Sequence, residues 1–272
     1  MAATKISKLR QLLGIILARQ AKHKKYASLS LGFIITFGVC ASAVGQAFQN
    51  LNFEQANPVS SGPLDVTAAS GLPGWTVYEG SEQTTELLYN DTTINEVSVD
   101  LLGLGFQTGE FPYPQGFGII DGKCSVVLQS GVAENYPALT FVTASIAQTG
   151  TVPEGTSSLL FKAWQGASPS AGGLSPFTVS FAGNNLSLVD LGSGTSANGA
   201  TYTSYGANMV PFAGETGQLV FTSLVQLGPA GEVELDDIGF SSQSAEEPSS
   251  SILMGVGGLV IFLALLNPVR RE

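Results

Sequence analysis

The chain has 272 residues, a formal net charge of −10, 44% hydrophobic residues and two cysteines. Its one histidine, His23, lies near the N-terminus, so the rest of the chain cannot build a Ser-His-Asp or Cys-His catalytic site, nor a histidine-ligated zinc or iron site. The sequence contains no phosphate-binding loop and no dinucleotide fingerprint. Gly192-Ser193-Gly194 has the Gly-x-Gly spacing, but no helical pattern follows it. Paired carboxylates for glycoside hydrolysis survive this exclusion, but no pattern places two of them in one cleft. We therefore expect a protein that is not an enzyme.

The first 47 residues have the order of a secretory signal. Seven of the eleven Lys and Arg residues lie before residue 26, and a run without charge follows from Tyr26 to Gly45. Ala41-Ser42-Ala43 and Gly45-Gln46-Ala47 then offer two small-residue cleavage sites. We expect residues 1–47 to be a helical signal peptide that is removed on export. An uncleaved signal anchor is the alternative, because one helical face of the charged region is apolar through Ile6, Leu9, Leu13 and Ile16.

Charge changes sign after this segment. All 21 acidic residues follow residue 47, and residues 48–245 hold 18 of them against two lysines, Lys123 and Lys162, which leaves a net charge of −16. Such a surface repels nucleic acid and anionic lipid headgroups, favours solubility and suits divalent cations, calcium first. Cys124 is the single cysteine after residue 47, so no intramolecular disulfide can form in that part of the chain. The oxidising environment that an exported protein meets would permit a disulfide.

Residues 48–243 carry the pattern of one all-β domain. Short runs rich in β-branched and aromatic residues recur between Gly, Pro and Asn clusters, and several of them alternate between two faces. Helical periodicity is absent, and so is any repeat with a period of about 20–50 residues. These features predict an antiparallel β-sandwich. The expected strands are Thr76–Tyr78, Glu96–Leu101, Cys124–Gln129, Ala138–Ile146, Ser158–Trp164, Phe177–Phe181, Leu186–Leu191, Gln218–Leu224 and Glu232–Phe240.

Two stretches between these strands, Gly103–Gly118 and Gly192–Pro211, are predicted to be long loops. A side chain on a loop is less often buried than one on a strand. Trp164 lies on an alternating strand and is therefore predicted to belong to the core. The aromatic residues that we expect to contact a sugar, if the domain binds one, are the loop residues Tyr113, Tyr202 and Tyr205.

The two ends of this domain resemble a known family. Asn50–Glu54 at its start and Glu234–Phe240 at its close are similar to the first and last strands of galactose-binding-like, carbohydrate-binding modules. The resemblance implies an antiparallel jelly-roll β-sandwich in which these two strands meet. In many such modules acidic residues near both ends hold a structural calcium ion, which implies Glu54, Asp236 and Asp237 as its ligands here. The alternative is that Asp237 caps a turn while Asp236 faces water.

Residues 244–272 form a tail of three parts. An acidic stretch, Glu246-Glu247-Pro248-Ser249, is followed by an uncharged apolar run from Ile252 to Leu266 and then by Arg270-Arg271. As a helix the run is about 22 Å long, which is short against a hydrocarbon core of about 30 Å. We expect a C-terminal transmembrane helix over residues 252–266, with the two arginines on the cytoplasmic side.

This tail resembles the PEP-CTERM sorting signal of Gram-negative bacteria, which has a Pro-Glu-Pro motif, an apolar helix and a closing arginine cluster and is read by an exosortase. Glu246 stands where the family has its first proline. The residues that match are Glu247, Pro248, Ser249, Arg270 and Arg271. The resemblance implies an exosortase-like processing partner, and it implies localisation at the membrane and cell envelope of a Gram-negative-type bacterium. A plain single-pass anchor is the alternative.

Together these features predict an exported, non-catalytic cell-surface or extracellular-matrix protein that is tethered to the membrane, processed through its tail and associated with exopolysaccharide. A carbohydrate-binding, lectin-like module and a plain membrane-anchored envelope protein are the alternatives. Structural calcium is the one cofactor expected. A concave, aromatic-lined site on the sandwich would favour the lectin-like module, whereas a featureless convex surface would favour the first function.

Overall fold

The computed structural model describes residues 45–91, 93, 96–106, 116–133, 140–168, 173–225 and 231–245. Almost all of the predicted signal peptide lies outside these residues. So do Tyr113, the helix predicted over residues 252–266 and the predicted sorting motif. Among the residues that the structure describes, no helix is both long enough and apolar enough to cross a membrane.

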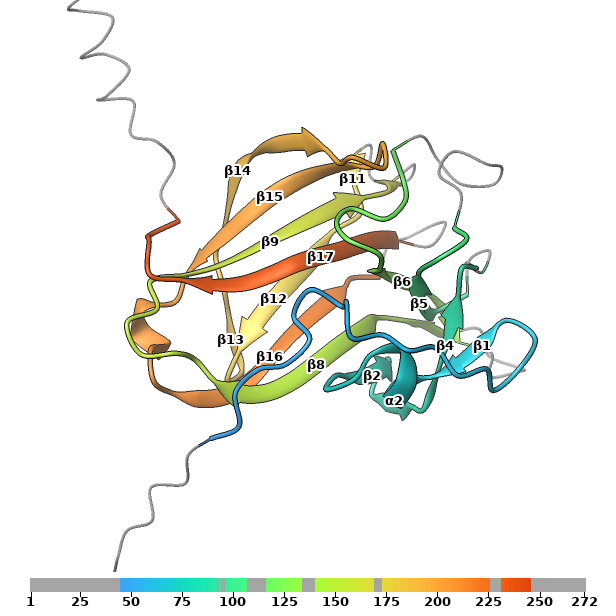
Figure 1. Cartoon of the computed structure of the whole chain (residues 1–272), viewed down its shortest axis with the longest axis horizontal. Coiled ribbons are helices and arrows are strands. Elements are labelled where there is room, and N and C mark those ends of the chain that lie inside the picture. Colours follow the sequence, from blue (N-terminus) through green and yellow to red (C-terminus); the bar gives the residue numbers. More distant parts are fainter. Residues whose placement is uncertain are drawn as a thin grey trace, which may run out of the picture. The chain divides into compact units, whose positions relative to one another are not determined.

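The described residues form an all-β domain with two main sheets (Figure 1). In order across the larger sheet, the strands are β1 (Asp65–Thr67), β4 (Glu86–Tyr89), β5 (Ser98–Leu102), β6 (Ser125–Ala133), β17 (Gly231–Ser241), β9 (Ser158–Gln165), β15 (Thr201–Asn208) and β14 (Leu188–Thr195), and β7 (Thr140–Val142) also pairs with β6. The smaller sheet has the order β13 (Asn184–Asn185), β12 (Phe177–Phe181), β16 (Thr216–Ser223), β8 (Ala144–Thr151), β2 (Thr76–Glu79) and β3 (Glu82–Thr84). The remaining elements are the hairpin of β10 (Ala167–Ser168) and β11 (Gly173–Leu174), the helix α2 (Ala68–Gly71) and the 3-10 turn η1 (Val210–Phe212).

The inner faces of the two sheets pack against each other. On β9, Leu159, Phe161 and Ala163 are buried, whereas Leu160 and Lys162 on the other face are partly exposed. The ring of Phe161 lies 5.2 Å from the ring of Phe221 on β16, so the core joins both sheets. Burial of each large side chain of this kind stabilises the fold by about 1.5–3 kcal/mol. The predicted two-layer, sandwich-like arrangement is therefore confirmed.

A second, smaller core lies on the outer face of the larger sheet, beneath residues 116–123, which we name the cover segment. Its members are Leu102, Phe117, Ile120, Val127, Trp164 and Ala200. The ring of Phe117 in the cover segment lies 5.1 Å from the ring of Trp164 on β9. Only 9% of Trp164 is exposed, which confirms the prediction that this residue belongs to the core.

Strands occur at all nine expected places, but three details of the prediction are wrong. The expected strand Ala138–Ile146 is two strands, β7 and β8, which belong to different sheets. The stretch Gly192–Pro211 is not a loop, because most of it belongs to the antiparallel hairpin of β14 and β15. The first half of β14 was predicted, as Leu186–Leu191, but Gly192–Thr195 and most of β15 are partly or fully exposed and lack the apolar alternation by which buried strands are recognised. In addition, β4 and β5 pair in parallel, although an antiparallel sandwich was expected throughout.

The beginning and the end of the domain lie together. Ile238 on β17 donates its amide hydrogen to the carbonyl oxygen of Leu51, and the rings of Phe48 and Phe240 are 5.2 Å apart. In Figure 1 the described segment begins and ends at the left of the domain, whereas the turn between β14 and β15 lies at the upper right. The first and last segments meet, but residues 51–54 form turns and not the first strand that the galactose-binding-like resemblance implied. Both connections to the rest of the chain therefore leave from one end of the sandwich.

Candidate functional site

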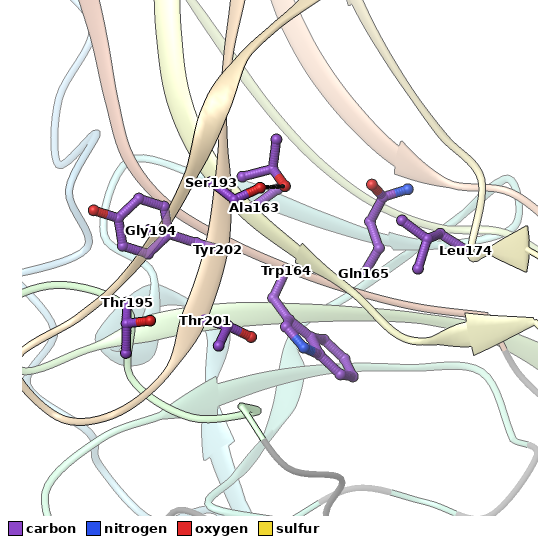
Figure 2. Close-up of a pocket in the computed structure, with 10 residues that line it drawn as sticks. Ala163, Trp164, Gln165, Leu174, Ser193, Gly194, Thr195, Thr201 and Tyr202 are labelled. Carbon is purple, nitrogen blue, oxygen red and sulfur yellow. Dashed lines mark hydrogen bonds between the residues drawn. The ribbon is translucent and has the colours of Figure 1, made fainter.

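A hollow of about 430 Å³ (Figure 2) opens where β9 ends at Gln165, away from the Ser158 end of that strand, which pairs with Ser241 near the close of the domain. We name it the first hollow. Its lining residues carry hydroxyl, amide and apolar groups and no charge: Ala163, Trp164, Gln165, Leu174, Ser193, Gly194, Thr195, Thr201, Tyr202 and Thr203. Within the hollow, the hydroxyl oxygens of Ser193 and Thr203 are 3.3 Å apart and share a hydrogen bond.

The two aromatic rings at the first hollow do not form its floor. Successive side chains of a strand point to opposite faces, and Figure 2 shows Trp164 and Gln165 pointing in opposite directions. The ring of Trp164 belongs to the second core, and the ring of Tyr202 lies beside the Lys162 ammonium, 5.2 Å away. Of the predicted sugar-binding residues, the structure therefore brings Tyr202 to the rim of the hollow, with its ring directed to the other face of the sheet.

Gln165 is held in one orientation at the first hollow. Its amide nitrogen donates to the carbonyl oxygen of Ser175 at 2.7 Å, and its amide oxygen accepts the hydroxyl hydrogen of Tyr205 at 2.6 Å. Burial, followed by the nearby carboxylate of Asp190, raises the pKa of Tyr205, so its hydroxyl stays protonated and able to donate. Tyr205 is thus a half-buried strand residue that stacks on Phe161 and positions Gln165, rather than the loop residue that was predicted.

The residues expected to hold calcium converge on one segment of the chain. Glu54 accepts hydrogen bonds from the amides of Lys123 and Cys124, at 2.6 and 3.1 Å. Asp236 accepts from the amide of Asp121 and from the hydroxyl of Ser125, at 2.9 and 2.7 Å. Among the described residues, no three His, Cys, Asp or Glu side chains lie close enough together to hold a metal ion. Calcium at these residues stays a prediction, and a fall in melting temperature on adding a chelator would support it.

Lys162 supplies a positive charge at this position. Its ammonium lies 2.6 Å from a carboxylate oxygen of Asp121 and 3.0 Å from one of Asp237. Burial lowers the pKa of Lys162, but the hydrogen bonds to Asp121 and Asp237 outweigh this effect and raise it above its usual range. The hydrogen bond from Lys162 in turn lowers the pKa of Asp121. The cation that balances these carboxylates is therefore a lysine from the neighbouring strand β9.

Asp237 reaches this position through an irregularity in β17. Its φ angle is +50°, and the pairing of β17 with β9 shifts register between Asp236 and Gly239. A bulge of this kind redirects a side chain, because one residue of the strand is left without an opposite partner. Asp236 on the regular side is 1% exposed, so it does not face water as the alternative prediction had it.

Two buried carboxyl groups hold the cover segment on the sheet. Glu234 is 0% exposed and accepts a hydrogen bond from the amide of Gly118, and Asp236 accepts one from the amide of Asp121. Burial raises the pKa of Glu234 well above its usual value, and the amide of Gly118 offsets only part of this. Burial likewise raises the pKa of Asp236 to about 7, against the hydrogen bond from Ser125. Because these two acids lie beneath the cover segment, they stabilise it and are not accessible to a ligand in solution.

The sequence alone missed Lys162, Gln165 and the hydroxyl groups of the first hollow. The one available signal for Lys162 was its place on the outer face of an alternating strand, and nothing in the sequence paired it with Asp121. Gln165 follows the predicted strand by one residue, and Ser193 and Thr203 fall in the stretch predicted to be a loop. Their neighbours come from other strands, so local pattern could not identify them.

No protein-family model matches the chain, and no curated protein matches it. Among solved structures, the chain is similar to the crystal structure of the enzymatically active domain of bacteriophage CBA120 tailspike protein 4, with 15% sequence identity and a TM-score of 0.33. The similarity covers 70% of this chain and 22% of that chain, so the protein spans about a fifth of that structure's length.

Proposed function

We propose that this is an exported cell-surface or matrix protein, tethered to the membrane through its PEP-CTERM-like tail, whose two-sheet body is a non-catalytic polysaccharide-binding module. The observation that carries the proposal is the placement of the first hollow. Both chain connections leave one end of the body, and the hollow opens at the other end. Along β9 these ends are separated by about 23 Å, at about 3.3 Å per residue from Ser158 to Gln165. A tethered body would therefore present its hollow away from the membrane.

The chemistry of the first hollow suits a hydroxylated ligand. The hydroxyls of Ser193, Thr195 and Thr203 and the amide of Gln165 can donate to and accept from sugar hydroxyls, whereas the Thr201 hydroxyl donates to the carbonyl oxygen of Gly116. Leu174, which is 60% exposed, offers an apolar contact for the C–H face of a sugar ring. No charged side chain lines the hollow, so a neutral sugar unit would leave no buried charge without a partner.

Two finer features belong to the same proposal. The meeting of the first and last segments supports the jelly-roll topology that the resemblance to galactose-binding-like modules implies. The tail implies an exosortase-like partner that would cut near Pro248 and release the body to the surface matrix. A plain membrane-anchored envelope protein, the second candidate, would keep the tail intact.

Mass spectrometry of the mature protein from its native cell tests the tether. We expect the mature chain to lack its first residues and to end near Pro248. A chain that still ends in Arg271-Glu272 would reject sorting and leave a plain anchor.

Glycan binding by the full-length protein, purified in detergent, tests the module. A tyrosine in place of Thr195 would fill the first hollow, and we expect Thr195→Tyr to lose polysaccharide binding. Thr140→Tyr is the matched control, since Thr140 is an exposed strand threonine outside the hollow. Equal binding by both variants would reject the first hollow as the binding site.

A further inference from the structure

A second hollow, of about 370 Å³, lies beside the cover segment. Its lining consists of three glycines, three apolar residues, one asparagine and one lysine: Gly103, Leu104, Gly105, Phe106, Ile119, Gly122, Lys123 and Asn198. The body has two lysines, and Lys162 is bound to Asp121 and Asp237. Lys123 is exposed and forms no ion pair with any residue in the described part of the chain. The second hollow therefore holds the one described cation of the body that is free to meet an anion.

The backbone holds Lys123 at a defined place. The amides of Lys123 and Cys124 both donate to one carboxylate oxygen of Glu54. Gly122 has a φ angle of +57°, and a β-carbon there would collide with the Glu54 carboxylate. Glu54 therefore fixes the backbone where the cover segment ends, and the exposed residue Lys123 is among those that line the second hollow.

The turn at the end of the β14–β15 hairpin lies between the two hollows. The turn at residues 196–200 joins β14 to β15, and Thr195 and Thr201 at its two ends line the first hollow, whereas Asn198 at its tip lines the second. This turn is fastened to the cover segment, since the amide of Thr201 donates to the carbonyl oxygen of Gly116 at 2.8 Å. Three residues span at most about 11 Å of extended chain, so a polymer lying in the first hollow would reach the second across the turn.

We propose that the second hollow binds a carboxylate-bearing sugar unit of the same polysaccharide that occupies the first hollow, with Lys123 as the residue that selects it. The inference rests on the proposed function. The Asn198 side-chain amide donates one hydrogen to the carbonyl oxygen of Ile119, so its second hydrogen and the Lys123 ammonium are the donors offered to a carboxylate. Leu104, which is 76% exposed, offers an apolar surface to the sugar ring. The ligand is then a polysaccharide in which acidic units are spaced between neutral ones, because a body with a net charge of −16 would repel a uniformly charged polymer.

Calorimetric titration of the full-length protein in detergent tests this assignment. The probes are a panel of uronic-acid oligosaccharides, each paired with its own methyl ester, which has the same sugar backbone without the charge. We expect each acid that binds to bind about fivefold tighter than its ester, as one exposed charge pair supplies about 1 kcal/mol. Lys123→Gln should abolish this preference by lowering the affinity for the acid to about that for its ester, whereas Lys123→Arg should keep it. An unchanged melting temperature in Lys123→Gln controls for folding.

The outcomes separate the two proposals. If esters bind as tightly as acids, or if Lys123→Gln keeps the preference for acids, Lys123 does not select a carboxylate and the inference is overturned. Ester binding that disappears in Thr195→Tyr would, in that case, leave the proposed function standing. If no oligosaccharide of either form binds, the proposed function and the inference both fall.

Discussion

At the scale of single residues, Lys162 is the centre of a charge network that joins three separate parts of the chain. It binds Asp121 in the cover segment and Asp237 in the bulge of β17, and its ammonium lies 5.2 Å from the ring of Tyr202 on β15. Without it, two carboxylates would lie close together with no counter-charge. Asp121 and Asp237 are more than half exposed, so water limits the energy of each pair.

We expect Lys162→Met, which keeps most of the aliphatic stem, to lower the free energy of unfolding by about 1 kcal/mol. Adding Asp121→Asn to this variant should recover part of the loss, because it removes one of the two carboxylates left unpaired. Denaturant titration of the full-length protein in detergent measures both effects. The matched control is Lys123→Met, which should change the free energy by no more than about 0.5 kcal/mol. Equal losses from the two lysine substitutions would contradict the network.

Glu234 and Asp236 form a second residue-scale feature, because both are buried acids with raised pKa values. The pKa of Asp236 is about 7 in the folded protein, against about 3.9 for an unfolded aspartate. The folded state therefore keeps protons that the unfolded state has lost, so the stabilising contribution is complete below about pH 4 and is lost as the pH rises through about 7. One pKa unit corresponds to about 1.4 kcal/mol, so this effect is on the order of 4 kcal/mol.

We expect the free energy of unfolding to fall as the pH rises from 5 to 8, and we expect the fall to be smaller in Glu234→Gln. The amide of that variant cannot ionise, keeps an acceptor for the amide of Gly118 and removes a charge beside Asp236. Denaturant titrations at several pH values measure the slope. Glu82→Gln, at an exposed position on β3, is the control and should follow the parent protein. Stability that is flat or that rises over this range would refute the assignment.

At the scale of elements, the turn that joins β12 to β13 has an alanine, Ala182, at a position where the φ angle is positive. Phe181 pairs with Asn184, so Ala182 and Gly183 form a two-residue loop, and their φ angles are +48° and +78°. Positive φ at both positions is typical of a type I′ turn, which favours Asn-Gly. Alanine is strained in this conformation because its β-carbon approaches the backbone oxygen.

We expect Ala182→Asn to raise the free energy of unfolding by about 0.5–1 kcal/mol, because asparagine tolerates a positive φ. Gly183→Ala should lower it by about 1–2 kcal/mol. A β-carbon at Gly183 would meet no atom within 4 Å, so backbone conformation alone accounts for that loss. Thermal melts of both variants measure the difference. A loss of stability in both would show that the turn differs from type I′.

At the scale of the whole molecule, the charge of the body is its dominant property. Its net charge of −16 comes from residues spread over most of its length, and one of its two lysines is used within the fold. Like charges repel each other over about a Debye length, which is about 10 Å at 0.1 M salt and about 3 Å at 1 M. The folded body therefore carries an electrostatic strain that salt relieves.

We expect the melting temperature of the full-length protein to rise when NaCl is increased from 0.1 to 1 M, because the repulsion is screened. The melting temperature of Lys162→Met should rise more than that of the parent, because in the parent the same screening also weakens the attraction between Lys162 and its two aspartates. CaCl2 at equal ionic strength is the control for ion type. A larger rise with calcium would support the calcium predicted at Glu54, Asp236 and Asp237, and a fall in NaCl would contradict the repulsion.

Local pattern in the sequence was enough to predict the all-β class, strands at the nine expected places and the burial of Trp164, because alternation along one strand decides which side chains are buried. Composition alone excluded histidine chemistry after the signal, and the predicted signal and sorting tail still depend on sequence alone. The tertiary structure decided what lies beside each residue. Strand register brought Lys162 to Asp121 and Asp237, and Gln165 to Tyr205, over separations of 40 or more residues. Local alternation carries no record of such register, so only the folded structure could identify the two hollows.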